Sequence, residues 1–251
     1  MSSSIWTRCA GDSEIRDLRL DPWRAVEAQH QLSTRKLVSS ADEQIVLEEL
    51  IDGAKPPDQT HGRRHYLLST PFRYPPLRHG TRFGTRLERG IWYGSETRET
   101  AFADVAYYRF VFRAGTRADL GVITTPLTVF RAKARSPHGV DLTAPPFDAY
   151  RRTIASPVRY DASQSLGAAM RAAGVELFRY PSARDPDGGA NVGVFTPDVF
   201  GRAKPRDLET WQCVATPEMV ELTKRDYFGR EVFTFERGVF LVGGVLPMPA
   251  V

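Results

Sequence analysis

The chain of 251 residues is long enough for one large domain, or for one domain with an appendage. With 41% hydrophobic and 25% charged residues it has the composition of a globular protein, which excludes a disordered or collagen-like chain. It has no apolar run of about 18 residues, no apolar signal-peptide core at its N-terminus, and only two cysteines, so we expect a cytoplasmic protein without a disulfide framework.

Positive charge is concentrated in one stretch of the sequence. Residues 1–62 hold 7 Lys and Arg against 11 Asp and Glu, so the net charge of +4 leaves +8 for the remainder. Residues 63–117 alone hold 11 arginines, no lysine and 4 acidic residues, a net of +7. A GC-rich genome would also favour arginine throughout, but it would not cluster it. Because arginine presents a planar donor fork to phosphate, the cluster indicates a nucleic acid or a compact phosphorylated ligand.

The first 60 residues have the pattern of an acidic, helical surface segment. Asp21 and Pro22 fit the start of a helix, and Trp23, Val26 and His30 follow at helical spacing.

A second helix is expected from Ser40 or Ala41 to Ile51. Acidic residues crowd its first turn, which favours the helix dipole, and an apolar stripe follows at helical spacing: Ile45, Leu47, Leu50 and Ile51. Gly53 and two nearby prolines end it. Such a helix is either an appendage packed on a larger body or an arm that binds a partner.

The pattern changes at His65. A strand is predicted over residues 66–70, followed by an irregular loop to residue 80 and a short apolar strand over 90–94. Ser95 or Thr97 can cap a helix that runs from about Arg98 to Phe112.

Strands dominate the rest of the chain. Leu120 to Ala132 reads as one or two strands, and Asp161 or Ser163 starts a helix that ends at Gly174. Five short strands are then predicted, over residues 175–179, 192–195, 211–214, 231–237 and 239–242. Since these strands do not alternate regularly with helices, the expected class is α+β.

Sequence motifs of the common enzyme classes are absent. The chain contains no GxxxxGK[ST], GxGxxG, HExxH or GxSxG, and its five histidines are scattered, so we expect no bound metal.

Instead, polar residues lie in loops and near the ends of predicted elements. Arg82 occupies a glycine-flanked loop, Tyr93 ends a strand, and Asp104 lies on the following helix. Ser182 and Asn191 bracket a polar loop between two strands. Such residues are also common as core, surface or turn residues, so the pattern alone predicts a phosphate-handling site of undefined chemistry.

These segments, in this order, resemble the RES-domain family, the toxins of Xre–RES toxin–antitoxin pairs. Eleven residues separate Arg82 from Tyr93, and eleven more separate Tyr93 from Asp104; the third matching segment is 180–191. The resemblance covers roughly residues 65–215. It divides the chain into an N-terminal helical extension, residues 1–62, and a RES domain, residues 63–251.

The resemblance implies an ADP-ribosyltransferase-like split β-sheet core with flanking helices and a cleft that binds NAD⁺. Family members split NAD⁺ at the nicotinamide–ribose bond and pass the ADP-ribosyl group to water or phosphate. One branch modifies a phosphoribosyl-pyrophosphate synthetase. The chain would thus be a metal-independent toxin that depletes NAD⁺, arrests growth and is silenced by an Xre-type antitoxin, and it would form a homodimer.

Residue roles follow from the same resemblance. Arg82, with Arg73 as a second candidate, would grip the pyrophosphate, and Tyr93 would wall the nicotinamide. Ser182 and Asn191 would fix the nicotinamide ribose or the incoming nucleophile.

Asp104 would stabilise the developing ribosyl cation, but the family acid is glutamate. The shorter side chain retracts the carboxylate by ~1.5 Å, and a misplacement of about 1 Å can lower a rate by on the order of a hundredfold. Glu99 lies about 140° round the helix and is no substitute. Either the pocket has closed in, or the protein is attenuated, or the acid was altered to permit expression.

Three further hypotheses stay open. The chain could be a protein ADP-ribosyltransferase, a nucleic-acid-binding module suggested by its basic stretch, or an inactive relative that only binds an antitoxin. No helix-turn-helix and no interleaved aromatic residues support direct nucleic-acid binding.

Overall fold

The computed structural model describes most of the chain. It covers residues 4–28, 38–54, 56, 63–74, 76, 78–226 and 229–249. Residue 62 lies outside the described residues, so the predicted boundary between residues 62 and 63 falls at their edge. His30 also lies outside the described residues.

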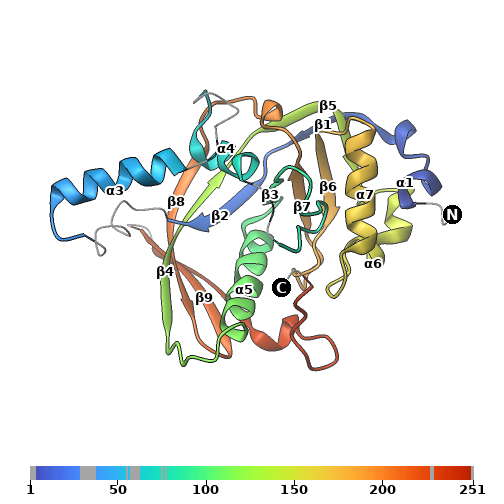
Figure 1. Cartoon of the computed structure of the whole chain (residues 1–251). Coiled ribbons are helices and arrows are strands. Elements are labelled where there is room, and N and C mark those ends of the chain that lie inside the picture. Colours follow the sequence, from blue (N-terminus) through green and yellow to red (C-terminus); the bar gives the residue numbers. More distant parts are fainter. Residues whose placement is uncertain are drawn as a thin grey trace.

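Ten strands of the described residues form one mixed sheet in the order β1-β5-β6-β7-β3-β2-β4-β8-β9-β10 (Figure 1). The strands are β1 Arg16–Leu20, β2 Trp23–Glu27, β3 Trp92–Ser95, β4 Ile123–Arg131, β5 Ala134–Asp141, β6 Leu177–Pro181, β7 Ala190–Val194, β8 Arg206–Ala215, β9 Met219–Asp226 and β10 Gly229–Glu236. Strands β5 and β6 run parallel, whereas the other recorded neighbours are antiparallel. This mixed architecture confirms the predicted α+β class.

Helices flank the sheet and connect its strands. They are α1 Ile5–Arg8, α3 Ala41–Ala54, α4 Tyr66–Arg73, α5 Arg98–Ala114, α6 Arg151–Ile154 and α7 Asp161–Ala172, with short 3₁₀ turns η1 Gly11–Glu14, η2 Phe147–Tyr150, η3 Pro197–Val199 and η4 Arg237–Phe240. Within the described part of the chain, no helix has the length and apolar character needed to cross a membrane.

The sheet has a narrow junction between β3 and β2. Across the described residues, a single registered pair, Trp23 with Ser95, joins these two strands, whereas β2 pairs with β4 along its whole length. A row of paired residues therefore crosses β2, β3, β7 and β6: Trp23, Ser95, Asn191 and Tyr180. The junction places residues from distant parts of the sequence next to one another.

Helix α5 packs against the half of the sheet that begins at β2. The Thr97 side chain accepts the backbone N–H of Thr100 and caps the helix, as predicted. One buried face carries Phe102, whose ring centroid lies 4.7 Å from that of Trp211 on β8. The face that contains Asp104 is left to border the sheet junction.

The N-terminal segment is not the helical extension that its spacing suggested. Trp23 and Val26 lie on β2, and β1 and β2 both belong to the main sheet, so the predicted helix after Pro22 is wrong. Tryptophan and valine suit a strand as well as a helix, and pairing with β4 decides between them. Helix α3 confirms the second helix.

Two predicted strands are also wrong. Residues 66–70 belong to α4, where the His65 ring accepts the backbone N–H of Leu67 and caps the helix. Residues 239–242 form the end of η4 and a turn closed by a bridge between Val242 and Val245. Strands β1, β5 and β9 were missed.

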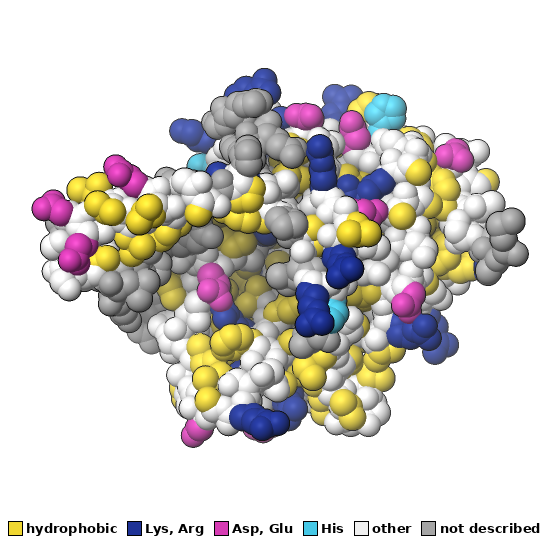
Figure 2. All heavy atoms as spheres, viewed as in Figure 1, with side chains coloured by type: hydrophobic (Ala, Val, Ile, Leu, Met, Phe, Trp, Pro, Cys, Tyr) yellow, Lys and Arg dark blue, Asp and Glu magenta, His cyan; other side chains and the backbone are white. Residues whose placement is uncertain are grey.

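The apolar stripe of α3 faces solvent. Its exposed fractions are 56% for Ile45 and 67% for Leu50. In Figure 2 the hydrophobic side chains run along this projecting helix with acidic side chains beside them. Within the described part of the chain, Ile45 and Leu50 are therefore not packed against other residues.

Candidate functional site

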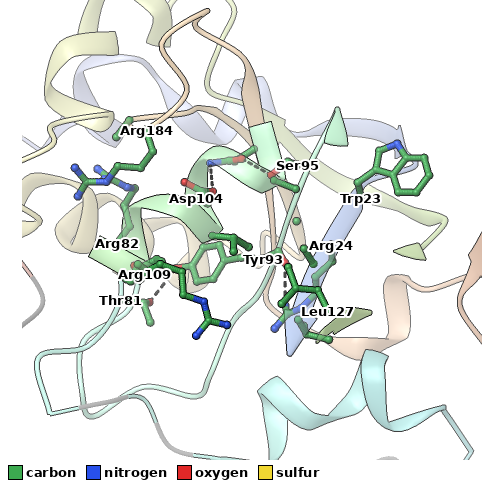
Figure 3. A pocket seen from close by; sticks show the side chains of 18 of the residues that line it. Trp23, Arg24, Thr81, Arg82, Tyr93, Ser95, Asp104, Arg109, Leu127 and Arg184 are labelled. Carbon is green, nitrogen blue, oxygen red and sulfur yellow. Dashed lines mark hydrogen bonds between the residues drawn. The ribbon is translucent and has the colours of Figure 1, made fainter. Parts of the chain in front are cut away.

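A cleft of about 670 Å³ opens at the sheet junction. Strand β2 and helix α5 border it, and residues of β3, β7 and the loop after β6 close its inner end. Its volume is in the range of sites for small organic ligands. Arg82, Tyr93, Asp104 and Asn191, four of the residues predicted from sequence, line it (Figure 3).

Asp104 lies at the inner end of this cleft, held by a chain of hydrogen bonds. The Asn191 side-chain amide donates to Asp104 Oδ2 at 3.1 Å, and Ser95 Oγ donates to Asn191 Oδ1 at 2.7 Å. Ser95 and Asn191 are direct partners in the pairing of β3 with β7, so the sheet brings them together. The carboxylate is thereby fixed by two residues of adjacent strands.

Burial raises the pKa of Asp104 to about 6. Arg82 and Arg184 oppose this shift by their positive charge, and the hydrogen bond from Asn191 also opposes it. At neutral pH the group is therefore mostly ionised, with a basicity well above that of an ordinary aspartate. Perturbed carboxylates of this kind cluster at functional sites.

Two buried arginines lie on one flank of the cleft (Figure 3). Arg82 Nη1 donates to the carbonyl oxygens of Ile154 and Ser156, at 3.2 and 2.8 Å. Arg184 Nη2 donates to the carbonyl oxygen of Pro157 at 3.1 Å. Each guanidinium has five N–H donors, so these bonds leave donors for a ligand.

Aromatic rings hold both guanidinium groups in place. Arg82 lies over the ring of Tyr160, 4.6 Å from its centroid, and Arg184 lies 3.5 Å from the centroid of Tyr107. Such cation–π contacts stabilise a buried positive charge without neutralising it. The inner end of the cleft therefore combines one carboxylate with two fixed cations.

Tyr93 lines the cleft, and its hydroxyl is anchored. It forms a hydrogen bond with Thr81 Oγ1 at 2.9 Å and accepts the backbone N–H of Phe83 at 3.3 Å. Burial raises the pKa of Tyr93 to about 12, so the phenol stays neutral. This anchoring fixes the loop that carries Arg82.

Two of the predicted site residues do not line the cleft. Ser182 is buried, and its Oγ accepts the backbone N–H groups of Arg184 and Asp185, so it shapes the loop from which Arg184 projects. Arg73 lies in the last turn of α4, where its guanidinium donates to the carbonyl oxygen of Pro56. Neither side chain is among those that surround Asp104.

A side-chain hydrogen bond from Thr100 adds to the contact of Arg184 with Tyr107 in tying the loop between β6 and β7 to α5. Thr100 Oγ1 donates to Asp185 Oδ2 at 2.7 Å. A Cβ at Gly189 would lie 2.2 Å from Thr100 Oγ1, so only glycine allows this close approach. The polar loop predicted from the sequence is therefore a rigid support for Arg184.

Sequence reasoning missed the contribution of β2. Arg24 lines the cleft, donates from Nη1 to the carbonyl oxygen of Tyr93 at 2.8 Å, and lies 5.1 Å from the centroid of the Trp92 ring. Burial lowers the pKa of Arg24 to about 10, which still leaves it charged at neutral pH. Because residues 23–27 were expected to form a surface helix, nothing in the pattern pointed to Arg24.

The family model of the RES domain matches residues 56–215, more than half of the chain. The chain belongs to the RES-domain family. RES domains are NAD-related and are associated with toxin–antitoxin systems, which implies an antitoxin as partner. No curated protein matches the sequence.

The RES match includes Arg82, Asp104 and Asn191, whereas β2 lies before it. In this RES domain the cleft is therefore completed by a strand from outside the matched residues. Among the residues that the structure describes, no group of three or more His, Cys, Asp or Glu side chains could hold a metal ion.

Proposed function

We propose that this RES domain cleaves NAD⁺ at the nicotinamide–ribose bond and transfers the ADP-ribosyl group to water or phosphate. The observation that carries the proposal is the placement of Asp104 beside two buried arginines in one cleft of a RES domain. A carboxylate and fixed cations are what a positively charged ribosyl centre and a pyrophosphate require.

Cleavage breaks the bond between ribose C1′ and the nicotinamide nitrogen. The bonding electron pair leaves with nicotinamide, which becomes neutral, and positive charge develops on the ribose. The Asp104 carboxylate stabilises this charge, with Asn191 and Ser95 holding it in place. Water then adds at C1′ and releases a proton to give ADP-ribose, or phosphate adds to give its phosphate ester.

Arginine donors of the cleft bind the pyrophosphate in this proposal. Arg82 and Arg184 keep free N–H groups beyond their bonds to carbonyl oxygens, and Arg24 lies near Tyr93 on the other side. The ring of Tyr93 forms one wall of the site for the nicotinamide. The protein then acts as a growth-arresting toxin in the cytoplasm, as a homodimer that an Xre-type antitoxin silences.

The direct test is release of nicotinamide from NAD⁺ by the purified protein, with and without phosphate, followed by mass spectrometry. The second product distinguishes ADP-ribose, its phosphate and a modified protein. Asp104→Asn should abolish release, whereas Glu99→Gln, on an exposed position of the same helix, should not.

Asp104→Glu separates an active site from an attenuated one. Release by the natural chain means that the pocket accommodates the shorter acid. Release only by Asp104→Glu means an attenuated toxin with an intact site. If neither protein releases nicotinamide at any phosphate concentration, the proposal is wrong.

A further inference from the structure

Strand β10 forms one edge of the sheet, next to β9 (Figure 1). Its eight residues, Gly229–Glu236, pair with β9 in one unbroken antiparallel register, and no described strand pairs with its other side. The strand also lies beyond residues 56–215, which the RES family model matches. This edge is therefore a feature of the chain that the family match does not account for.

Strand β10 lacks the features that usually keep an exposed edge from pairing with another strand. Protected edges are commonly short, bulged, or interrupted by proline or lysine. The opposite edge of the sheet fits this description, because β1 has five residues and its register with β5 shifts between Arg16 and Leu18. Strand β10 is longer and regular, and it contains neither proline nor lysine. Its edge is therefore suited to pairing with an additional strand.

The backbone groups on the outer side of β10 belong to alternate residues. Arg237 donates its backbone N–H to the carbonyl oxygen of Glu218, one position beyond the last registered pair of β9 with β10. In an antiparallel ladder, residues that exchange hydrogen bonds with one neighbour alternate with residues whose N–H and C=O groups point away from it. The odd-numbered residues of β10 therefore bond to β9. The groups that point away belong to four residues with exposed side chains: Arg230, Val232, Thr234 and Glu236.

We propose that β10 pairs with β10 of a second copy of this chain, antiparallel and centred on Phe233. In this register Arg230 lies opposite Glu236 of the partner subunit, and Val232 lies opposite Thr234 of the partner subunit. Two-fold symmetry repeats both pairs. Each pair joins residues whose backbone groups point away from β9, so the two strands can exchange hydrogen bonds. The inference rests on the homodimer of the proposed function, whose interface it names, and is independent of NAD⁺ cleavage.

The charges of β10 favour the same register. Opposite charges directly across a strand pair stabilise it, and like charges destabilise it. A shift of two residues in either direction keeps the hydrogen-bonding pattern but no longer places Arg230 opposite Glu236. Within the chain, Arg230 Nη2 lies 3.0 Å from Glu221 Oε1 and its side chain is 48% exposed, so its other N–H groups can reach a second carboxylate. The strand is therefore complementary to itself in both charge and hydrogen bonding.

A charge-reversal experiment tests the register. Sedimentation velocity of the full chain, over protein concentrations that span the monomer–dimer transition, should show a dimer and gives its Kd. Arg230→Glu or Glu236→Arg alone places like charges opposite each other at both symmetric pairs and should raise the Kd about tenfold. An equimolar mixture of these two variants restores opposite charges at both pairs and should recover the Kd of the natural chain. Arg159→Glu, an exposed charge reversal in the loop before α7, should not change it.

A second variant tests the backbone pairing itself. Val232→Pro removes an N–H group that points away from β9, so the hydrogen bonds between β9 and β10 are retained while the outer edge is blocked. The dimer should be lost, and circular dichroism should show an unchanged fold.

Three results would overturn the inference. They are a natural chain that stays monomeric at the highest soluble concentration, a dimer whose Kd neither charge variant changes, and a mixture of the two variants that does not recover the Kd. Nicotinamide release is measured separately on the same samples. If the charge variants and their mixture behave as expected but no nicotinamide is released, the interface stands and the proposed reaction falls.

Discussion

Asn191 presents its amide nitrogen to Asp104, 3.1 Å from Oδ2, because its oxygen is already engaged by Ser95. The Ser95 hydroxyl thus acts on the carboxylate through the orientation of one amide. Without it, the amide oxygen could turn toward Asp104 and repel it. A hydroxyl that does not itself contact the carboxylate therefore controls the environment of the acid.

Ser95→Ala should lower the turnover number for nicotinamide release by about tenfold with a small effect on KM. The variant removes the hydroxyl that donates to Asn191 Oδ1 and so orients the amide. A misplacement of about 1 Å can cost about a hundredfold in rate, and a looser support for Asp104 should cost a part of that. The acid limb of the pH profile should also shift to higher pH, because a disordered Asn191 amide no longer lowers the pKa of Asp104. Steady-state rates between pH 4.5 and 8.5 measure both.

The matched control is Ser136→Ala, which removes another buried hydroxyl, one that donates to Glu176 and does not line the cleft. It should leave the pH profile unchanged. An unaltered rate and profile for Ser95→Ala would contradict the role given to Ser95.

The rate of nicotinamide release should rise with pH through about 6. The ionised carboxylate is the form that stabilises positive charge, and burial raises the pKa of Asp104 to about 6. Protonation below this value should lower kcat/KM tenfold for each pH unit, provided that the fold persists. Circular dichroism at each pH separates loss of ionisation from unfolding, and a flat profile down to pH 5 would argue against Asp104 as the acting group.

Asp104→Asn should stabilise the fold at pH 8 while it abolishes activity. The pKa of Asp104 is about 6 in the folded chain and close to 3.9 when unfolded, so the folded state binds more protons between pH 4 and 6. Stability contributed by this group is therefore lost as the pH rises through that window. The variant removes a penalty of about 3 kcal/mol, because each of the roughly two pKa units corresponds to about 1.4 kcal/mol, and Tm should rise by several degrees.

Thermal melts of both proteins should differ at pH 8 and converge near pH 4, where Asp104 is protonated. The comparison of two chains at one pH cancels the titration of all other carboxylates. A lower Tm for Asp104→Asn at pH 8 would contradict this prediction. It would show that the attraction between the Asp104 carboxylate and the neighbouring arginines outweighs the cost of burying the charge.

Thr100→Val should weaken substrate binding and leave the pH profile intact. Valine keeps the shape of threonine but cannot donate to Asp185, so the loop that presents Arg184 loses one of its links to α5 and keeps the contact of Arg184 with Tyr107. We expect KM for NAD⁺ to rise about fivefold, which corresponds to about 1 kcal/mol, the typical net contribution of one hydrogen bond. Steady-state kinetics measure the change; a lower turnover number with unchanged KM would place Thr100 in the chemistry instead.

Much of this site could be predicted from the sequence because neighbouring residues in the sequence specify helix α5 and the loop before β7. The capping hydroxyl of Thr97 and the apolar face that includes Phe102 specify α5, and the polar loop before Asn191 follows from its turn residues. Asp104 and Asn191 were therefore both found, although nothing in the sequence showed that they touch.

The remainder depended on pairing between distant segments. Residues 23–27 have no strong intrinsic preference for helix or strand. Their pairing with β4 makes them a strand and places Arg24 at the cleft. The position of Ser182 was not predictable for a related reason: its hydroxyl can either reach a ligand or close a turn, and in the structure it accepts backbone N–H groups of the loop.

The central position of β2 has a consequence for the growing chain on the ribosome. This strand is synthesised early, yet its neighbours β4 and β3 come much later, and Asn191 later still. Long-range pairing of this kind must wait until the partner strands have emerged. The cleft therefore cannot assemble before Asn191 has been synthesised, so a shorter nascent chain carries Asp104 and Arg24 without the completed site.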